Sequence, residues 1–173
     1  MSCPLTAGYT LGCRDSQGGV EEVIAIEIAN IESVTTTAGE VTAITMATGT
    51  QGWKLEQEQA TAMFEDNPIG DRANGTYRAE QNLTIVFNDR AKETRNLVNL
   101  LAKNRLCFVV KENTGRYSFA GLERGLMLAD GTAGTGTAHA DRNGFTLPFT
   151  GVERELSPTV DSSIVAALLT PAP

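Results

Sequence analysis

Alternating hydrophobic and polar positions begin near residue 20, after an opening stretch rich in glycine. One side of the alternating run holds Ile24, Ile26 and Ile28. This period of two predicts a half-buried β-strand. Two more short strands are expected over 31–36 and 41–46, joined by a turn at Ala38-Gly39. The folded body therefore opens with consecutive β-strands.

Two uninterrupted runs in the middle of the chain predict a long β-hairpin over 53–88. Neither 53–66 nor 76–88 contains glycine or proline, and both alternate apolar and polar side chains. Residues 67–75 hold Pro68 and an Asn-Gly pair, which predict a polar loop at the tip. A helix over 53–66 is the alternative, since glutamine and glutamate are good helix formers. A lone two-stranded extension is only marginally stable in water, so we expect another copy of the chain to cover it.

The hydrophobic period then changes to that of a helix. Between residues 89 and 104 the apolar side recurs at helical spacing and holds Ala91, Thr94, Leu97, Val98 and Leu101. Asn88 or Asp89 is expected to cap the start. This pattern predicts one amphipathic helix that lies on a sheet.

Further strands are predicted after the helix. A hairpin is expected over 106–120, and a strand over 145–153 follows a tight turn at Asn143-Gly144. Pro148 has no N–H to donate, which predicts that this last strand lies at an edge or carries a bulge. The apolar tail, 160–169, predicts a docked helix, a docked strand or an arm that orders against a neighbour.

The composition favours a mainly β protein of one domain. The chain has 173 residues, among them 21 Thr, which suits pleated surfaces, and 17 Gly, which suits turns. We expect an N-terminal arm over 1–19, a body over 20–155 and a C-terminal arm over 156–173. The predicted class is mainly β (α+β), a sandwich or barrel-like fold with the long hairpin and one flanking helix.

Charge and residue counts narrow the range of partners. The net charge of −7 opposes tight binding of phosphates, although it does not oppose a protein that DNA slides past. Cys3, Cys13, Cys107 and His139 are scattered and have no CxxC spacing, so no metal or cofactor is expected. No apolar stretch approaches about 18 residues and no signal peptide is evident, so no membrane partner is expected.

Three patterns invite a catalytic or ligand-binding interpretation, and each has a simpler one. His139 and Asp141 lack a nucleophile-elbow motif, so a surface histidine is expected. The glycines of 131–136 do not match GxGxxG, and a mobile loop is expected. Glu56 and Glu58, with Glu80 opposite, offer paired carboxylates, but a solvated acidic face is the simpler interpretation. We expect no enzyme; a small β-rich hydrolase is the least favoured alternative.

Two further segments of the sequence have a distinctive pattern. The first is Cys3-Pro4-Leu5-Thr6-Ala7-Gly8-Tyr9-Thr10-Leu11-Gly12-Cys13-Arg14-Asp15-Ser16; the second includes Gly134-Thr135-Gly136-Thr137-Ala138 and Asp141-Arg142-Asn143-Gly144-Phe145-Thr146-Leu147-Pro148-Phe149-Thr150-Gly151. Together with the order of predicted elements, they make the chain resemble tail tube proteins of long-tailed bacteriophages.

That resemblance implies self-assembly. Six copies would close their inner sheets into a β-barrel ring, and the rings would stack into the tube through which DNA is ejected into the host. The hairpin and the terminal arms would join one ring to the next. The implied partners are further copies and other tail proteins (tape measure, terminator and tip), while DNA passes without specific binding. The implied location is the virion tail, after assembly in the host cytoplasm.

Within that resemblance we assign two sets of residues. The polar side of the hairpin is expected to face the lumen, where a net acidic wall repels phosphates. It holds Lys54, Glu56, Glu58, Arg78, Glu80 and Asn82. The tip expected to contact the next ring holds Asp66, Asn67, Pro68, Ile69, Gly70, Asp71, Arg72 and Asn74. The alternative role is a tail terminator or neck ring, which copy number per particle would distinguish.

Overall fold

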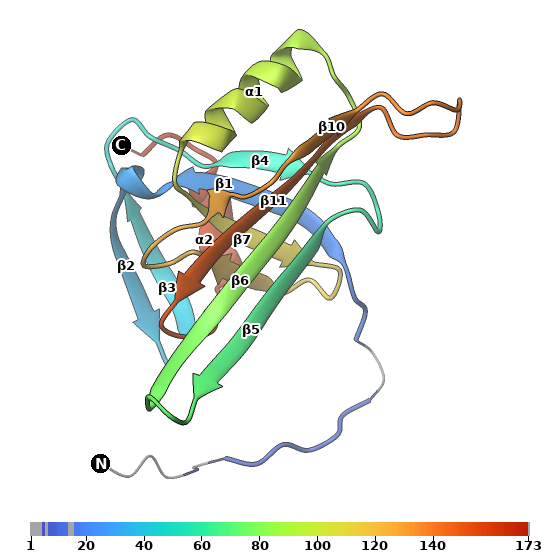
Figure 1. The fold of residues 1–173 in the computed structure, drawn as a ribbon. Helices are drawn as coiled ribbons and strands as arrows, with labels where there is room; N and C mark the ends of the chain where they lie inside the picture. Colours follow the sequence, from blue (N-terminus) through green and yellow to red (C-terminus); the bar gives the residue numbers. More distant parts are fainter. Residues whose placement is uncertain (1–4, 6, 14–15, 173) are drawn as a thin grey trace.

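The computed structural model describes residues 5, 7–13 and 16–172, which form two β-sheets and two α-helices (Figure 1). Sheet A has the order β2 (Ile31–Thr37), β3 (Glu40–Met46), β12 (Thr159–Val160), β8 (Tyr117–Ala120), β7 (Leu106–Glu112), β1 (Val20–Glu27), β4 (Trp53–Glu56). Sheet B has the order β10 (Thr132–Gly134), β11 (Gly144–Glu153), β6 (Thr76–Phe87), β5 (Met63–Asp71), with β9 (Met127–Leu128) also on β11. The helices are α1 (Lys92–Lys103) and α2 (Ser162–Leu168), and a 3₁₀ turn, η1, spans Ile28–Asn30.

The main core lies between the two sheets. Alternating residues of each strand point to opposite faces of a sheet, so one face of sheet A packs on one face of sheet B. This core joins Val23, Ala25, Leu55, Phe108 and Val110 of sheet A to Leu83, Ile85, Phe145, Leu147 and Phe149 of sheet B. The rings of Phe108 and Phe149 meet with their centroids 4.9 Å apart. The predicted mainly β class is therefore confirmed.

A second core covers the other face of sheet A. Ile24, Ile26 and Val109 point to this side, where Val165 and Leu168 of α2 pack against them. Asp161 begins α2 by accepting a hydrogen bond from the Ser163 N–H at 2.9 Å. Of the alternatives for the C-terminal segment, the structure shows a short strand followed by a docked helix.

Helix α1 covers one end of the sandwich (Figure 1). Leu101 is buried and Leu97 and Val98 pack on the main core, which confirms the predicted apolar side except for the exposed Ala91. The helix begins at Lys92 rather than at residue 89. Asp89 lies just before it and accepts hydrogen bonds from the Ala91 N–H at 3.1 Å and the Thr94 hydroxyl at 3.3 Å.

The predicted hairpin over 53–88 is wrong in its first strand. Trp53–Glu56 forms β4, which pairs with β1 in sheet A, and the hairpin of sheet B consists of β5 and β6. The chain changes sheets over 57–62, where Ala60 has a φ of +58°. The side chain of Gln57 accepts the N–H of Val86 at 2.9 Å, so it replaces a backbone partner at that end of β6.

The predicted loop over 67–75 is also wrong for most of its length. Strand β5 continues to Asp71, and Pro68 lies opposite Ala79. A proline is tolerated here because β5 is an edge strand and only one of its sides is paired. The turn is reduced to Arg72–Gly75, and the Asp71 carboxylate accepts the Ala73 N–H at 2.9 Å and the Asn74 side-chain amide at 2.6 Å.

Strand β11 corrects two further expectations. Gly144 is not part of a tight turn; it pairs with Gly134, and residues 135–143 form the longer connection between β10 and β11. Pro148 lies in an interior strand rather than at an edge or a bulge. One side of β11 pairs with β6. On its other side the partner strand changes from β9 to β10, and at this change the Pro148 carbonyl accepts the Ala129 N–H at 2.8 Å. The proline therefore occupies a gap between two partner strands.

Candidate assembly surfaces

The residues predicted to face a lumen do not share one surface. Lys54 and Glu56 lie on β4 of sheet A, and Glu58 is exposed in the 57–62 connection. Arg78, Glu80 and Asn82 lie on β6 of sheet B. The prediction of a single polar face is therefore wrong: the structure divides these residues between two separate patches and does not place the carboxylates of Glu56 and Glu58 opposite Glu80.

The patch on sheet A is a small ion-pair network. The ammonium of Lys54 lies 2.8 Å from a carboxylate oxygen of Glu22 and 3.2 Å from one of Glu56. The hydrogen bond to Glu22, followed by the one to Glu56, raises the pKa of Lys54 above its ordinary value. Because Lys54 and Glu56 are well exposed, this network fixes side-chain positions without contributing much to stability.

The patch on sheet B belongs to the outer face of that sheet, which we call the open face. Arg78 and Glu80 form an ion pair on it, with Nε and Oε1 3.0 Å apart. Cross-strand neighbours extend it onto β5 and β11. They are Glu65, Asn67, Thr150 and Val152. These neighbours are all exposed, so the described residues leave this part of the open face uncovered and largely polar, whereas Val86 at its other end is buried.

Both sheets end in strands that have a partner on one side only. Among the described residues, β5 forms one edge of sheet B, β10 and β9 lie along the other, and β2 and β4 are the edges of sheet A. An edge strand presents unpaired N–H and C=O groups, which another strand can pair with. Sheet B thus combines two free edges with an uncovered face.

The predicted tip residues divide between a strand and a turn. The six residues of 66–71 lie in β5, and only Arg72 and Asn74 lie in the turn. Asp66 does not project from the hairpin tip. Its Oδ2 accepts the N–H of Ser157 at 2.5 Å and the Ser157 hydroxyl at 2.7 Å, which ties β5 to the C-terminal segment. Its other carboxylate oxygen is buried and has no hydrogen-bond partner.

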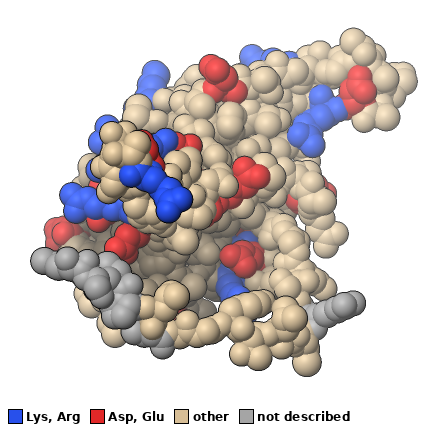
Figure 2. All heavy atoms as spheres, turned by 60° about the horizontal axis from the view of Figure 1, so that its bottom comes forward, with Lys and Arg blue, Asp and Glu red and all other residues tan. Residues whose placement is uncertain are grey.

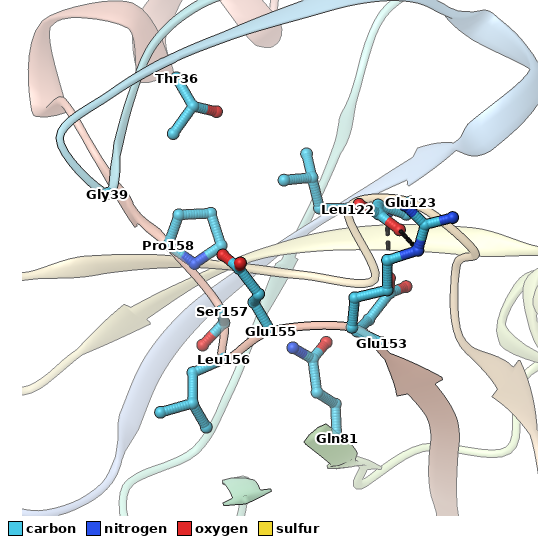
Figure 3. A pocket seen from close by; sticks show the side chains of 11 residues that line it. Thr36, Gly39, Gln81, Leu122, Glu123, Glu153, Glu155, Leu156, Ser157 and Pro158 are labelled. Carbon is cyan, nitrogen blue, oxygen red and sulfur yellow. Dashed lines mark hydrogen bonds and ion pairs between the residues drawn. The ribbon is translucent and has the colours of Figure 1, made fainter. Parts of the chain in front are cut away.

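A cavity of about 520 Å³ is lined by Gln81 of β6 together with residues of the 122–123 and 153–158 segments. Figure 3 shows Gln81 and Glu123 at this cavity, and Nε of Arg154 lies 3.3 Å from the Glu123 carboxylate. Glu153 is 4 % exposed and its carboxylate accepts the N–H groups of Glu123 and Arg124 at 3.3 and 2.9 Å. This buried carboxylate thus stabilises the turn that contains Glu123 and Arg124. Sequence reasoning missed both Gln81 and Glu153, although a polar residue on the apolar side of a strand is the signal that marks them.

The histidine, Asp141 and the cysteines, which the sequence offered as candidate chemical groups, do not come together in one site among the described residues. His139 is exposed in the 135–143 connection, where Asp141 accepts the N–H groups of Thr137 and Ala138, both at 2.8 Å. These bonds, that from Ala138 first, lower the pKa of Asp141. Cys107 is buried, and burial raises the pKa of its thiol to about 12. Cys3 lies outside the described residues. Within the described ranges, no group of three His, Cys, Asp or Glu could hold a metal ion.

Charges of both signs are mixed over the face drawn in Figure 2. Lysine and arginine side chains lie beside aspartate and glutamate, and uncharged residues occupy most of the surface. Broad basic patches are the usual signature of proteins that grip phosphates. The described surface in this view has no such patch.

None of the described helices has the length and apolar character needed to span a membrane. Comparisons with models of protein families, with curated proteins and with solved structures give no match. The interpretation of function therefore rests on the geometry of the surfaces.

Proposed function

We propose that the protein is a structural subunit that assembles with copies of itself into rings, and that the rings stack into the tail tube of a bacteriophage. The observation that carries the proposal is the form of sheet B. Its described strands leave an uncovered polar face and a free edge on each side. A long hairpin forms one of these edges, as the resemblance of the sequence to tail tube proteins implies.

Edge pairing is the physical route to a ring. If β5 of one copy pairs with β10 of the next, the sheets continue from subunit to subunit with the same contact repeated. Such a head-to-tail contact generates a closed ring when its rotation closes. Closure would also remove the free edges, which otherwise favour aggregation.

The open face would then line the inside of the ring. Its charged residues on β5 and β6 are Glu65, Asp71, Arg78 and Glu80, and its polar neighbours include Asn67, Asn82 and Thr150. A polar wall with a small acidic excess has little attraction for phosphates, so DNA could pass without being held. This assigns Arg78, Glu80 and Asn82 to the lumen, as the sequence predicted, and leaves Lys54 and Glu56 outside it.

Negative-stain electron microscopy of the purified protein, over a range of concentrations and salt, tests the proposal. We expect rings of uniform diameter, and stacks of rings if the protein forms the tube. Single rings that never stack would favour a terminator or neck ring. A protein that stays monomeric at every concentration would contradict the assembly itself.

A pair of matched variants locates the contact. Glu65→Lys/Asn67→Lys places two lysines on the β5 edge, where positive charge opposes strand pairing. Glu32→Lys/Ser33→Lys makes the same change in charge on β2, an edge strand of sheet A. We expect the first protein to lose rings and the second to keep them. Rings that persist equally in both proteins would show that β5 does not form the contact.

A further inference from the structure

An apolar groove lies between α1 and the free edge strand β4. It has a volume of about 300 Å³, and its lining includes Trp53, Leu55, Leu97, Leu100 and Leu101. Trp53 is 63 % exposed and Leu100 is 61 % exposed, although both are large hydrophobic residues. At one end, the Asn104 amide donates to the Glu27 carboxylate at 3.2 Å. An exposed apolar surface next to a free strand edge is typical of a binding site for another chain segment.

The described part of the N-terminal arm is uncharged, and its large hydrophobic side chains are exposed. Leu5, Tyr9 and Leu11 are 98, 88 and 86 % exposed, and none of residues 5 and 7–13 is charged. In an extended chain Tyr9 and Leu11 point to the same side, because successive side chains alternate. The arm therefore presents an apolar side that its own body does not cover.

The arm and the groove lie at opposite ends of the molecule. Residues 7–13 run beneath the β5–β6 hairpin, whereas α1 and β4 lie at the other end (Figure 1). A contact between them in two different copies is consequently head-to-tail, and it leaves one arm and one groove free for the next copy.

We propose that residues 7–13 of one copy bind in the α1–β4 groove of a second copy, where they add a strand to the free edge of β4. Backbone hydrogen bonds to β4 would provide affinity, and the side chains of Tyr9 and Leu11 would fill the groove beside Trp53 and Leu100. This contact involves only the groove and the arm. It does not require the edges of sheet B, which form the contact proposed above for the ring.

Trp53 reports directly on the binding, because it is the single tryptophan of the chain and it lines the groove. When an arm covers it, its fluorescence emission should shift to shorter wavelength. We expect the shift in the wild-type protein to increase with protein concentration, together with the sedimentation coefficient. An emission maximum that stays at the solvent-exposed wavelength at all concentrations would overturn the proposal.

Two matched pairs of variants test the contact. In the arm, Leu11→Asp places a charge on the apolar side, while Thr10→Asp places it on the opposite side. On α1, Leu100→Asp alters the groove, while Asn99→Asp adds the same charge at the neighbouring exposed residue. We expect Leu11→Asp and Leu100→Asp to weaken binding about tenfold or more, because a carboxylate would be buried without a partner. The emission shift of these variants should therefore require a protein concentration higher by the same factor. Equal effects of both members of a pair would overturn the assignment.

Mixing the two defective proteins distinguishes a second copy from the protein's own arm. The Leu11→Asp protein keeps an intact groove, and the Leu100→Asp protein keeps an intact arm. The mixture should regain the shift, since one arm can still bind one groove. A blue-shifted emission that does not depend on concentration and is not regained on mixing would show that the arm folds back on its own groove, which overturns the proposal. The Glu65→Lys/Asn67→Lys protein should keep the shift, so failure of ring closure and failure of arm binding are measured separately.

Discussion

Substitution of Gln81 by methionine measures how firmly the hairpin is attached to sheet A. Gln81 is 1 % exposed, and its side-chain oxygen accepts the N–H of Gly121 at 2.8 Å, just after β8. Methionine has a similar length and keeps the apolar packing, but it removes the acceptor. The Gly121 N–H is then buried without a partner, which costs about 1–3 kcal/mol of unfolding free energy.

The expected loss is large enough to measure. For a chain of this size each kcal/mol lowers Tm by about 2–4 °C, so the loss corresponds to about 2–12 °C. Urea unfolding at a concentration where the protein is monomeric should show a lower midpoint with an unchanged m-value. Hydrogen exchange of the Gly121 amide should accelerate in the same variant.

A neighbouring substitution provides the control. Asn82→Met changes the next residue of β6, whose side chain is half-buried on the open face, and should alter the unfolding free energy by less than about 0.5 kcal/mol. Equal stability of Gln81→Met and that control would show that the hydrogen bond from Gly121 to Gln81 does not contribute to the unfolding free energy. Water from the adjacent cavity would then satisfy the Gly121 N–H as well as Gln81 does.

Two further predictions concern the backbone of sheet B and the hairpin turn. A Cβ at Gly144 would lie 1.9 Å from the Phe87 carbonyl oxygen, whereas one at Gly134, its direct partner, would meet nothing within 4 Å. Gly144→Ala should therefore lower Tm severely and Gly134→Ala should not; similar thermal unfolding of the two would contradict this account. The Asn74 side chain, followed by the Ala73 N–H, lowers the pKa of Asp71. The carboxylate therefore stabilises the folded hairpin above about pH 3.9, the ordinary aspartate pKa, and this contribution is lost as pH falls through the lowered pKa. The stability advantage of the wild type over Asp71→Asn should narrow between about pH 5 and pH 2, and an advantage that stays constant would count against the turn geometry.

The elements that have a local hydrophobic pattern could be predicted from the sequence alone. The alternation of Ile24, Ile26 and their neighbours identified β1, and the helical spacing of Leu97, Val98 and Leu101 identified α1. Burial of one face of a strand or helix depends on the period of its own residues, so these assignments required no knowledge of a partner.

The pairing of the strands, by contrast, depends on the packing of the whole chain. Trp53–Glu56 alternates as a hairpin strand would, but β4 pairs with β1, because a period of two fits any edge that offers an apolar face. The break over 57–62 depends on the positive φ of Ala60 and on the distant partner of Gln57, and neither has a local signal.

The surfaces of interest depend on tertiary structure for the same reason. Polarity marked Arg78, Glu80 and Asn82 as a solvent-facing side of a strand, which they are. The open face, the free edges and the α1–β4 groove are defined by what no other element covers. Coverage is a property of the whole packed chain, so the sequence pattern of one element cannot determine it.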